Sequence, residues 1–313
     1  MESEKKVYYQ SFDDVKLCGI LSKVNDDNRI VVFCHGLNSD KSGREIYTQF
    51  AKELRDVNIN SFRFDFRAHG ESGGNDYDMN ITKEIKDVEA TLDMLIAHGY
   101  TEIILHGSSF GGGIISLLDY SKYKEVKAII LWYAALDFNV ATTKKGLLLS
   151  KEHREIARRE GYYTVENPRT GRKFRIGESV FDEAEIYYPY KNLINQDVKM
   201  LFLHGTEDMV VPYQLSENVS KMCKNAQLEL IKNGSHAFSG NQTDIDDAIE
   251  RTKRFIIESF KESKTTTPKW SSGFLAIIKL YSGYTKFSSW ILLRTSFKYL
   301  CASYLAIGKF WSR

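Results

Sequence analysis

Short apolar runs alternate with longer amphipathic stretches along most of the chain. Residues 7–10 and 16–24 predict an opening hairpin whose turn holds Asp13 and Asp14. The unbroken apolar run over 30–34 is typical of a strand buried on both faces of a sheet. Further strands are predicted at 61–66, 102–106 and 126–133, and helices at about 43–57, 81–98 and 111–121. The pattern predicts an α/β fold, a doubly wound and mostly parallel sheet covered by helices on both faces.

The alternation breaks between residues 136 and 195, where the sequence is charged, irregular and interrupted by Gly161, Pro168 and Gly171. It resumes with strands at 198–203 and 228–231, a helix from Pro212 and another over 244–260. We expect residues 136–195 to form a cap inserted into a domain of residues 1–263. Residues 264–313 are expected to follow that domain as a separate helical tail.

The tail carries its own charge and its own apolar pattern. Eight of the 43 basic residues and none of the 41 acidic ones follow Glu262. Apolar and aromatic residues recur there at spacings of three and four, which predicts one stripe on a helix. A basic helix of this kind suits an anionic membrane surface, so residues 287–313 are expected to bind one, or to dock on the body or on a second subunit. The stripe consists of Trp290, Leu293, Phe297, Leu300, Tyr304, Ile307 and Trp311.

Composition limits the class of protein and its partners. Hydrophobic residues make up 42% and charged residues 27% of the chain, which is ordinary for a globular protein. Residues 1–262 carry more acidic than basic side chains, which argues against nucleic acid as a partner. The four cysteines are widely separated, and residues 1–10 lack the apolar run of a signal peptide. We expect a cytoplasmic protein, or one peripheral at the inner face of a membrane, with no cofactor or metal; its oligomeric state stays open.

A candidate nucleophile lies directly after the predicted strand 102–106, where a G-x-S-x-G motif opens a helix. A serine on such a sharp strand-to-helix turn exposes its hydroxyl, and the flanking glycines leave room for the neighbouring backbone. Ser109 occupies the central position, and Ser108 lies one place too early for the glycine spacing. The motif is Gly107-Ser108-Ser109-Phe110-Gly111.

A serine hydroxyl needs a base, and the base needs an acid to orient it. His236 follows the last predicted strand, and Asp208 follows the strand before it. Both positions lie at the edge where doubly wound sheets place their sites, and the order Ser, Asp, His is the order that the α/β-hydrolase fold uses. Glu207 is the alternative acid, but Asp208 lies at the usual distance before the next helix.

These motifs together resemble the α/β-hydrolase superfamily over residues 7–260, and within it the cinnamoyl and feruloyl esterases. His35-Gly36-Leu37 is similar to the oxyanion-loop motif of the superfamily, and Asp65–Ser72 is similar to its D-x-R-G-x-G-x-S loop. The resemblance implies an oxyanion hole formed by the backbone N–H groups of Leu37 and Phe110. It also implies that the cap selects the substrate.

The cap holds six aromatic residues and a basic cluster. An acyl or aryl pocket with a cationic rim is one interpretation, suited to an anionic or amphiphilic ester. The other is that the aromatic side chains only pack the cap on the core while the basic ones form a solvated face. The aromatic residues are Tyr162, Tyr163, Phe174, Phe181, Tyr187 and Tyr188, and the basic ones Arg154, Arg158, Arg159, Arg169, Arg172, Lys173 and Arg175.

The remaining histidines are interpreted as structural. We expect His98, His106 and His153 to be surface or satisfied core residues, and His35, His69 and His204 to hold loops through hydrogen bonds. The sequence thus predicts a serine hydrolase that cleaves a carboxylic ester or thioester through an acyl-enzyme, with Ser109, His236 and Asp208 as its triad. An acyltransferase on the same triad, with a lipid-linked or polyanionic acceptor, and a non-catalytic binding protein on this fold are the alternatives.

Overall fold

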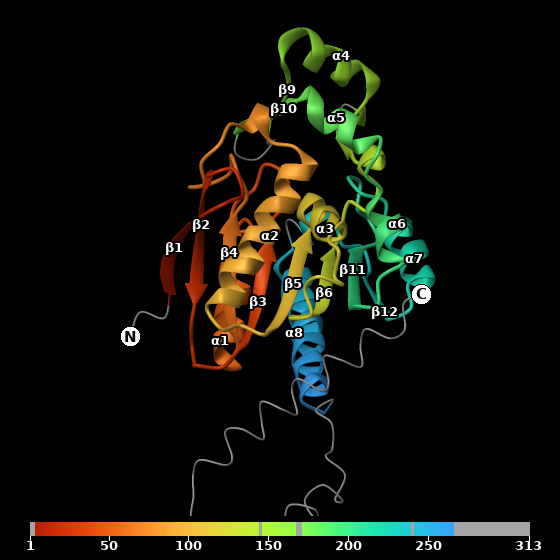
Figure 1. The fold of residues 1–313 in the computed structure, drawn as a ribbon. Helices are drawn as coiled ribbons and strands as arrows, with labels where there is room; N and C mark the ends of the chain where they lie inside the picture. Colours follow the sequence, from red (N-terminus) through yellow and green to blue (C-terminus); the bar gives the residue numbers. More distant parts are fainter. Residues whose placement is uncertain (1–3, 144–145, 167–170, 239–240, 266–313) are drawn as a thin grey trace, which may run out of the picture. The chain divides into compact units, whose positions relative to one another are not determined.

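The computed structural model describes residues 4–143, 146–166, 171–238 and 241–265 (Figure 1). One eight-stranded sheet has the order β1-β2-β4-β3-β5-β6-β11-β12; β1 and β2 run antiparallel to their neighbours and the others are parallel. The strands are β1 Glu4–Gln10, β2 Lys16–Ser22, β3 Arg29–Cys34, β4 Asn60–Asp65, β5 Glu102–Ser108, β6 Val126–Trp132, β11 Lys199–Gly205 and β12 Ala226–Ile231. The predicted α/β fold with a mostly parallel sheet is confirmed.

Helices cover both faces of this sheet, as the unbroken apolar strands require. Along β3, Ile30 and Val32 face one apolar cluster while Val31 and Phe33 face the other. The first cluster includes side chains of α2, α3 and α7, and the second includes those of α1 and α8. These helices are α1 Ile46–Asp56, α2 Ile81–Ala97, α3 Ser109–Ile115, α7 Tyr213–Met222 and α8 Gln242–Thr265.

Helix α1 begins three residues later than predicted because the chain makes a left-handed turn before it. Gly43, Arg44 and Glu45 have φ angles of 56°, 59° and 72°. Helix α3 is shorter than predicted and ends at Ile115, with turns continuing to about residue 122. The pattern placed these apolar segments correctly, but the turns at their ends depend on local contacts that it does not encode.

The segment between β6 and β11 is more regular than predicted. It contains a short 3₁₀ turn and two-residue strands, then helices and a hairpin: η2 Phe138–Val140, β7 Thr142–Thr143, β8 Gly146–Leu147, α4 Lys151–Glu160, β9 Tyr162–Glu166, β10 Lys173–Gly177, α5 Glu178–Ala184 and α6 Pro189–Leu193. Figure 1 shows α4, the β9–β10 hairpin and α5 beyond the carboxyl ends of the parallel strands.

The sequence pattern does not predict helix α4, because this helix is almost entirely polar and Ala157 is its one buried residue. Its ends carry clear signals instead. Ser150 accepts a hydrogen bond from the backbone N–H of His153, and Gly161 follows the helix with a φ of 87°. Capping therefore defines this helix better than an apolar stripe does.

The predicted tail is described only at residues 264–265, where it continues α8. Its proposed membrane-binding segment 287–313 lies outside the described residues and stays a prediction. Within the described ranges, no helix combines the length and apolar character that spanning a membrane demands.

Candidate active site

The candidate nucleophile occupies a sharp turn between β5 and α3. Ser109 has a φ of 51°, a backbone conformation that is strained for a residue with a side chain. A Cβ atom on Gly111 would lie 2.3 Å from the carbonyl oxygen of His35, so only glycine fits there. The backbone N–H of Ala135 donates to the carbonyl oxygen of Ser109 at 2.9 Å. These contacts fix the turn and present the Ser109 hydroxyl at the carboxyl edge of the sheet.

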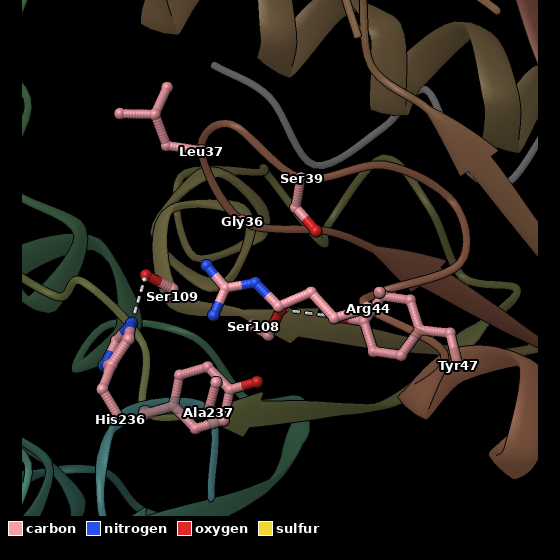
Figure 2. Close-up of a pocket in the computed structure, with 11 residues that line it drawn as sticks. Gly36, Leu37, Ser39, Arg44, Tyr47, Ser108, Ser109, His236 and Ala237 are labelled. Carbon is pink, nitrogen blue, oxygen red and sulfur yellow. Dashed lines mark hydrogen bonds between the residues drawn. The ribbon is translucent and has the colours of Figure 1, made fainter. Parts of the chain in front are cut away.

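Three segments far apart in the sequence meet at this hydroxyl. Nε2 of His236 lies 3.1 Å from Oγ of Ser109, and Nδ1 of the same ring lies 2.7 Å from Oδ2 of Asp208 (Figure 2 shows the first contact). Asp208 follows β11, and His236 begins the short turn η3 (His236–Phe238) that follows β12. The arrangement lets an imidazole take a proton from the hydroxyl while a carboxylate orients the ring.

The carboxylate of Asp208 is buried and accepts several hydrogen bonds. The N–H groups of Val210 and Val211 donate to its Oδ1 at 2.8 and 2.9 Å, and His204 contacts its Oδ2 at 3.1 Å. Burial by itself raises the pKa of this carboxyl. The hydrogen bonds from His204 and His236 outweigh burial and hold the pKa of Asp208 well below its usual range.

The two rival residues have other hydrogen-bond partners. Ser108 lines the same pocket as Ser109, but its hydroxyl accepts a hydrogen bond from the hydroxyl of Tyr47 at 2.6 Å. Glu207 is exposed, and its backbone N–H donates to the carbonyl oxygen of Gly234 at 2.9 Å. Geometry thus favours Ser109 over Ser108, and Asp208 over Glu207.

The residues expected to form the oxyanion hole lie on either side of the hydroxyl. Leu37 lines the same pocket as Ser109 and His236, and a Cβ atom on its neighbour Gly36 would lie 3.1 Å from Cβ of Ser109. Phe110 is the second residue of α3, so its N–H belongs to the first turn, where helices leave their donors free. Within the described part of the chain neither N–H donates a hydrogen bond.

The loop that carries Leu37 is held by the loop that follows β4. The Lys41 N–H and ammonium donate to the two oxygens of Asp65, each at 2.6 Å. Nε2 of His69 accepts from the N–H of Asn38 at 3.3 Å, and Nε2 of His35 accepts from the N–H of Phe66 at 3.1 Å. The expectation that His35 and His69 hold loops is confirmed. Because burial lowers their pKa values, to about 4 and about 3, both rings stay neutral.

His106 does not fit its predicted role. It is fully buried, yet neither of its ring nitrogens has a hydrogen-bond partner among the described residues. Aromatic rings surround it, with Trp132 at 4.6 Å and Phe33 at 5.2 Å between ring centroids. Burial lowers the pKa of His106 to about 3. It is therefore a neutral ring in an apolar setting, neither exposed nor satisfied by hydrogen bonds.

The pocket beside Ser109 contains three side chains that no sequence motif singled out. Tyr47 and Tyr133 are buried, and the ring of Tyr133 lies 4.8 Å from that of His236 between centroids. Arg44 lines the same pocket (Figure 2). Arg44 lies in the turn before α1, Tyr47 is the second residue of that helix, and Tyr133 directly follows β6. Only the tertiary fold brings them to the nucleophile.

In the segment expected to form the cap, most of the described arginines pair with acidic side chains. Arg154 pairs with Asp182 and Glu185, Arg158 pairs with Glu155 and Glu178, and Arg159 pairs with Glu160. Arg175 pairs with Asp76 on the body, while Arg169 lies outside the described residues. Phe174 and Phe181 are buried in a cluster that also contains Met79 of the body, and the ring of Phe174 stacks on that of His69 at 4.6 Å. These contacts favour the interpretation that the aromatic side chains pack this segment on the body.

Metal ligands are not grouped in the part of the chain that the structure describes: no cluster of three or more His, Cys, Asp or Glu side chains there is suited to a metal ion.

The sheet topology and the arrangement at its carboxyl edge define the chain as an α/β hydrolase of the serine hydrolase class. More specifically, the chain belongs to the family described as serine aminopeptidase, S33, whose model matches residues 25–243.

Curated relatives point in the same direction. Palmitoyl-protein thioesterase ABHD10, mitochondrial, from Mus musculus is 29% identical over 217 residues, which cover 66% of this chain and 68% of the relative. The Bos taurus protein of the same name is 28% identical over 211 residues, 66% of each chain. About a third of each relative therefore lies outside the segment that matches this chain.

Two solved structures share the fold. Est1E from Butyrivibrio proteoclasticus, with ferulic acid bound, superposes with a TM-score of 0.66 at 22% identity, over 82% of this chain and 99% of that chain. ABHD10 from mouse superposes with a TM-score of 0.65 at 25% identity, over 81% and 99% of the two chains. The recognition of the α/β-hydrolase fold from sequence motifs is confirmed.

Proposed function

We propose that this hydrolase cleaves a carboxylic ester or thioester through an acyl-enzyme intermediate. One observation carries the proposal, the hydrogen-bonded sequence from Oγ of Ser109 through the ring of His236 to Asp208. A serine hydroxyl is a weak nucleophile until a neighbouring base removes its proton. Here the base is within reach and a buried carboxylate holds its ring.

Each side chain has a defined step in this mechanism. Ser109 attacks the substrate carbonyl while Nε2 of His236 takes the hydroxyl proton, and the ring then returns that proton to the departing alcohol or thiol. Water, activated by the same nitrogen, hydrolyses the acyl-enzyme. Asp208 accepts from Nδ1 throughout, which fixes the tautomer that leaves Nε2 free to accept. Its low pKa keeps the carboxylate ionised while the imidazolium forms.

The N–H groups of Leu37 and Phe110 are proposed to stabilise the oxyanion. Leu37 follows Gly36, whose lack of a side chain lets this loop approach Ser109 closely. Phe110 lies at the amino end of α3, where the helix dipole favours negative charge. Removing one such donor from a serine hydrolase typically costs about 3 kcal/mol of transition-state stabilisation.

The relatives support the substrate class. The curated relatives are named as palmitoyl-protein thioesterases, and the solved Est1E structure holds ferulic acid. A thioesterase cleaves an acyl group at its carbonyl carbon, and ferulic acid is a carboxylic acid of the kind that ester hydrolysis releases. We therefore infer an acyl ester or thioester as the substrate of this chain as well.

Labelling with a fluorophosphonate probe tests the nucleophile. The probe should label the wild-type chain and Ser108→Ala, while Ser109→Ala should remain unlabelled with its fold intact by circular dichroism. Absence of label on the folded wild-type protein would support instead the alternative of a non-catalytic protein on a hydrolase fold. Label that persists in Ser109→Ala and disappears in Ser108→Ala would move the nucleophile to the neighbouring serine.

Product analysis separates hydrolysis from acyl transfer. The acyl-enzyme is common to both reactions, and only the acceptor differs. With p-nitrophenyl butyrate and a series of added alcohols, a hydrolase releases butyrate in proportion to nitrophenol. A transferase would form a new butyrate ester at the expense of free butyrate.

A further inference from the structure

An arginine shares the pocket of the candidate nucleophile. The pocket is lined by Ser109, His236, Tyr133, Tyr47 and Arg44 together with the glycine-containing loop of residues 36–39. Figure 2 shows the guanidinium group of Arg44 extended across this pocket toward Ser109. Burial raises the pKa of Tyr133 to about 12, while a hydrogen bond with Ser108 and, to a smaller extent, the charge of Arg44 oppose that rise. A positive charge thus lies where part of a substrate has to bind.

Arg44 has no carboxylate partner within the described part of the chain. Among the residues that the structure describes, no Asp or Glu oxygen lies within 4.0 Å of its guanidinium. The other arginines near the site behave differently. Arg175 pairs with Asp76, and Arg67 pairs with Asp13 and Asp87. Across the described ranges, most arginines pair with a carboxylate, and Arg44 does not.

The backbone holds this arginine at the pocket in an unfavourable conformation. Arg44 and Glu45 both have positive φ angles, and each non-glycine residue in that region costs about 1–2 kcal/mol. The turn is fixed by Tyr47, whose ring leaves no room for a side chain at Gly43. The Tyr47 hydroxyl in turn donates to Ser108 at 2.6 Å. Strain that the surroundings enforce in this way is typical of ligand-binding positions.

We propose that Arg44 binds an anionic group, a carboxylate or phosphate, on the acyl or the leaving part of the substrate. The proposal rests on the ester or thioester hydrolysis inferred above and names its substrate class more closely. A guanidinium group binds carboxylate and phosphate oxygens in a bidentate manner. Arg44 itself is exposed, so its charge is open to an incoming anionic group, while Tyr47 and Tyr133 beside it in the pocket are buried. The same charge disfavours the amino-terminal ammonium group that an aminopeptidase has to bind.

Two matched pairs of chromogenic esters test the proposal. The acyl pair is the p-nitrophenyl monoester of glutaric acid and p-nitrophenyl valerate, which differ by a terminal carboxylate. The leaving-group pair is p-nitrophenyl butyrate with and without a carboxylate on its ring. Each ester is assayed with wild type, Arg44→Gln, Arg44→Lys and the control Arg254→Gln. Arg254 is an exposed arginine of α8 outside the pocket lining, so its variant loses the same charge away from the site.

The readout is the ratio of kcat/KM between variant and wild type for each ester, so intrinsic ester reactivity cancels. In at least one pair, Arg44→Gln should lower kcat/KM for the anionic ester about tenfold and change the neutral ester less than twofold. Arg44→Lys should lose less, and Arg254→Gln should leave both esters unchanged. The pair that responds shows whether the anion belongs to the acyl or the leaving part.

Equal effects of Arg44→Gln on the anionic and neutral esters of both pairs would overturn the role of Arg44 while leaving the proposed hydrolysis intact. Failure of the wild-type protein to hydrolyse any of the four esters, with no probe label on Ser109, would overturn the proposed function itself. Raised salt gives a further check, since it should weaken the wild-type reaction of the responding anionic ester more than that of its neutral partner.

Discussion

Nε2 of His204 lies 3.1 Å from Oδ2 of Asp208, the same oxygen that Nδ1 of His236 contacts at 2.7 Å. That nitrogen also lies 3.0 Å from the carbonyl oxygen of Val211. Since both partners are acceptors, Nε2 of His204 carries the proton and Nδ1 accepts from the hydroxyl of Ser216 at 2.8 Å. A fully buried histidine on β11 thus helps to hold the carboxylate that orients the candidate base.

Replacement of His204 by alanine should therefore reduce catalysis more than it reduces substrate binding. Asp208 would lose one donor, its pKa would rise toward the usual range, and its hold on His236 would weaken. We expect kcat for p-nitrophenyl butyrate to fall about tenfold or more, with KM changed less than twofold, because a hydrogen bond to a charged group contributes about 1.5–3 kcal/mol.

Ser216→Ala is the matched control for that variant. It removes the hydrogen bond to Nδ1 of His204 but leaves the contact between Nε2 and Asp208 in place. Its free energy of unfolding should fall by about 1 kcal/mol, while kcat should stay within twofold of wild type. Similar losses of kcat in the two variants would contradict a specific role for the His204–Asp208 contact.

Tyr47→Phe should impair the reaction through the neighbour of the nucleophile. The buried hydroxyl of Tyr47 donates to Ser108 at 2.6 Å and lies 3.2 Å from the carbonyl oxygen of Cys34. Without it, Ser108 and the turn after it are held less firmly. We expect kcat/KM to fall about fivefold and the free energy of unfolding to fall by about 1 kcal/mol in a urea titration.

Tyr120→Phe provides the comparison, since Tyr120 is also buried and its hydroxyl donates to the carbonyl oxygen of Ile115 at 2.6 Å. The loss of stability should be similar, but kcat/KM should be unchanged because this bond lies at the far end of α3. If both variants lose activity alike, the Tyr47 hydroxyl has no particular effect on the site.

Gly111→Ala should disrupt the turn at the nucleophile. A Cβ atom there would lie 2.3 Å from the carbonyl oxygen of His35 and 2.6 Å from that of Cys34, and neither backbone can move without shifting β3. We expect a loss of more than about 3 kcal/mol in the free energy of unfolding, or no folded protein at all.

Gly161→Ala is a comparison in which backbone strain, and not the approach of a neighbouring atom, opposes alanine. Gly161 has a φ of 87°, but an added methyl group would have no described atom within 4 Å, so alanine there meets backbone strain. The expected loss is about 1 kcal/mol, as for other replacements of a glycine at a helix end. Equal losses at the two sites would show that the contacts with β3 are not what excludes a side chain at Gly111.

Sequence patterns predicted those parts of the molecule that depend on local order along the chain. The run 30–34 is apolar throughout because both faces of β3 are buried, and this alone marks a central strand. Parallel strands bring their carboxyl ends to one edge, so residues that follow β5, β11 and β12 converge without any knowledge of side-chain contacts. The meeting of Ser109, Asp208 and His236 could be predicted for that reason.

Other features depend on contacts between distant segments, and the sequence carries little sign of them. Arg44 reaches the pocket only because three left-handed residues turn the chain before α1. The expectation that His204 holds a loop is confirmed by its contact with the carbonyl oxygen of Val211, but nothing in the pattern shows that its ring also faces Asp208. The capping serine and the glycine at the ends of α4 could have revealed that helix, but its polar sequence offered no apolar stripe.

His106 should make the stability of the protein depend on pH. Burial among Phe33, Tyr47 and Trp132 lowers its pKa to about 3 in the folded state, against about 6.5 for an unfolded chain. Between these two values the unfolded state binds one more proton than the folded state. The free energy of unfolding therefore falls as the pH drops below about 6.5, by about 1.4 kcal/mol for each pH unit.

His106→Leu removes this titration and also two ring nitrogens that have no hydrogen-bond partner among the described residues. Urea titrations of both proteins at pH 8 and pH 5 should show the difference. At pH 5 the variant should gain about 2 kcal/mol relative to wild type compared with their difference at pH 8, because only the wild type then protonates this ring on unfolding. A difference between the two proteins that is the same at both pH values would mean that His106 is charged, or accessible to water, in the folded state.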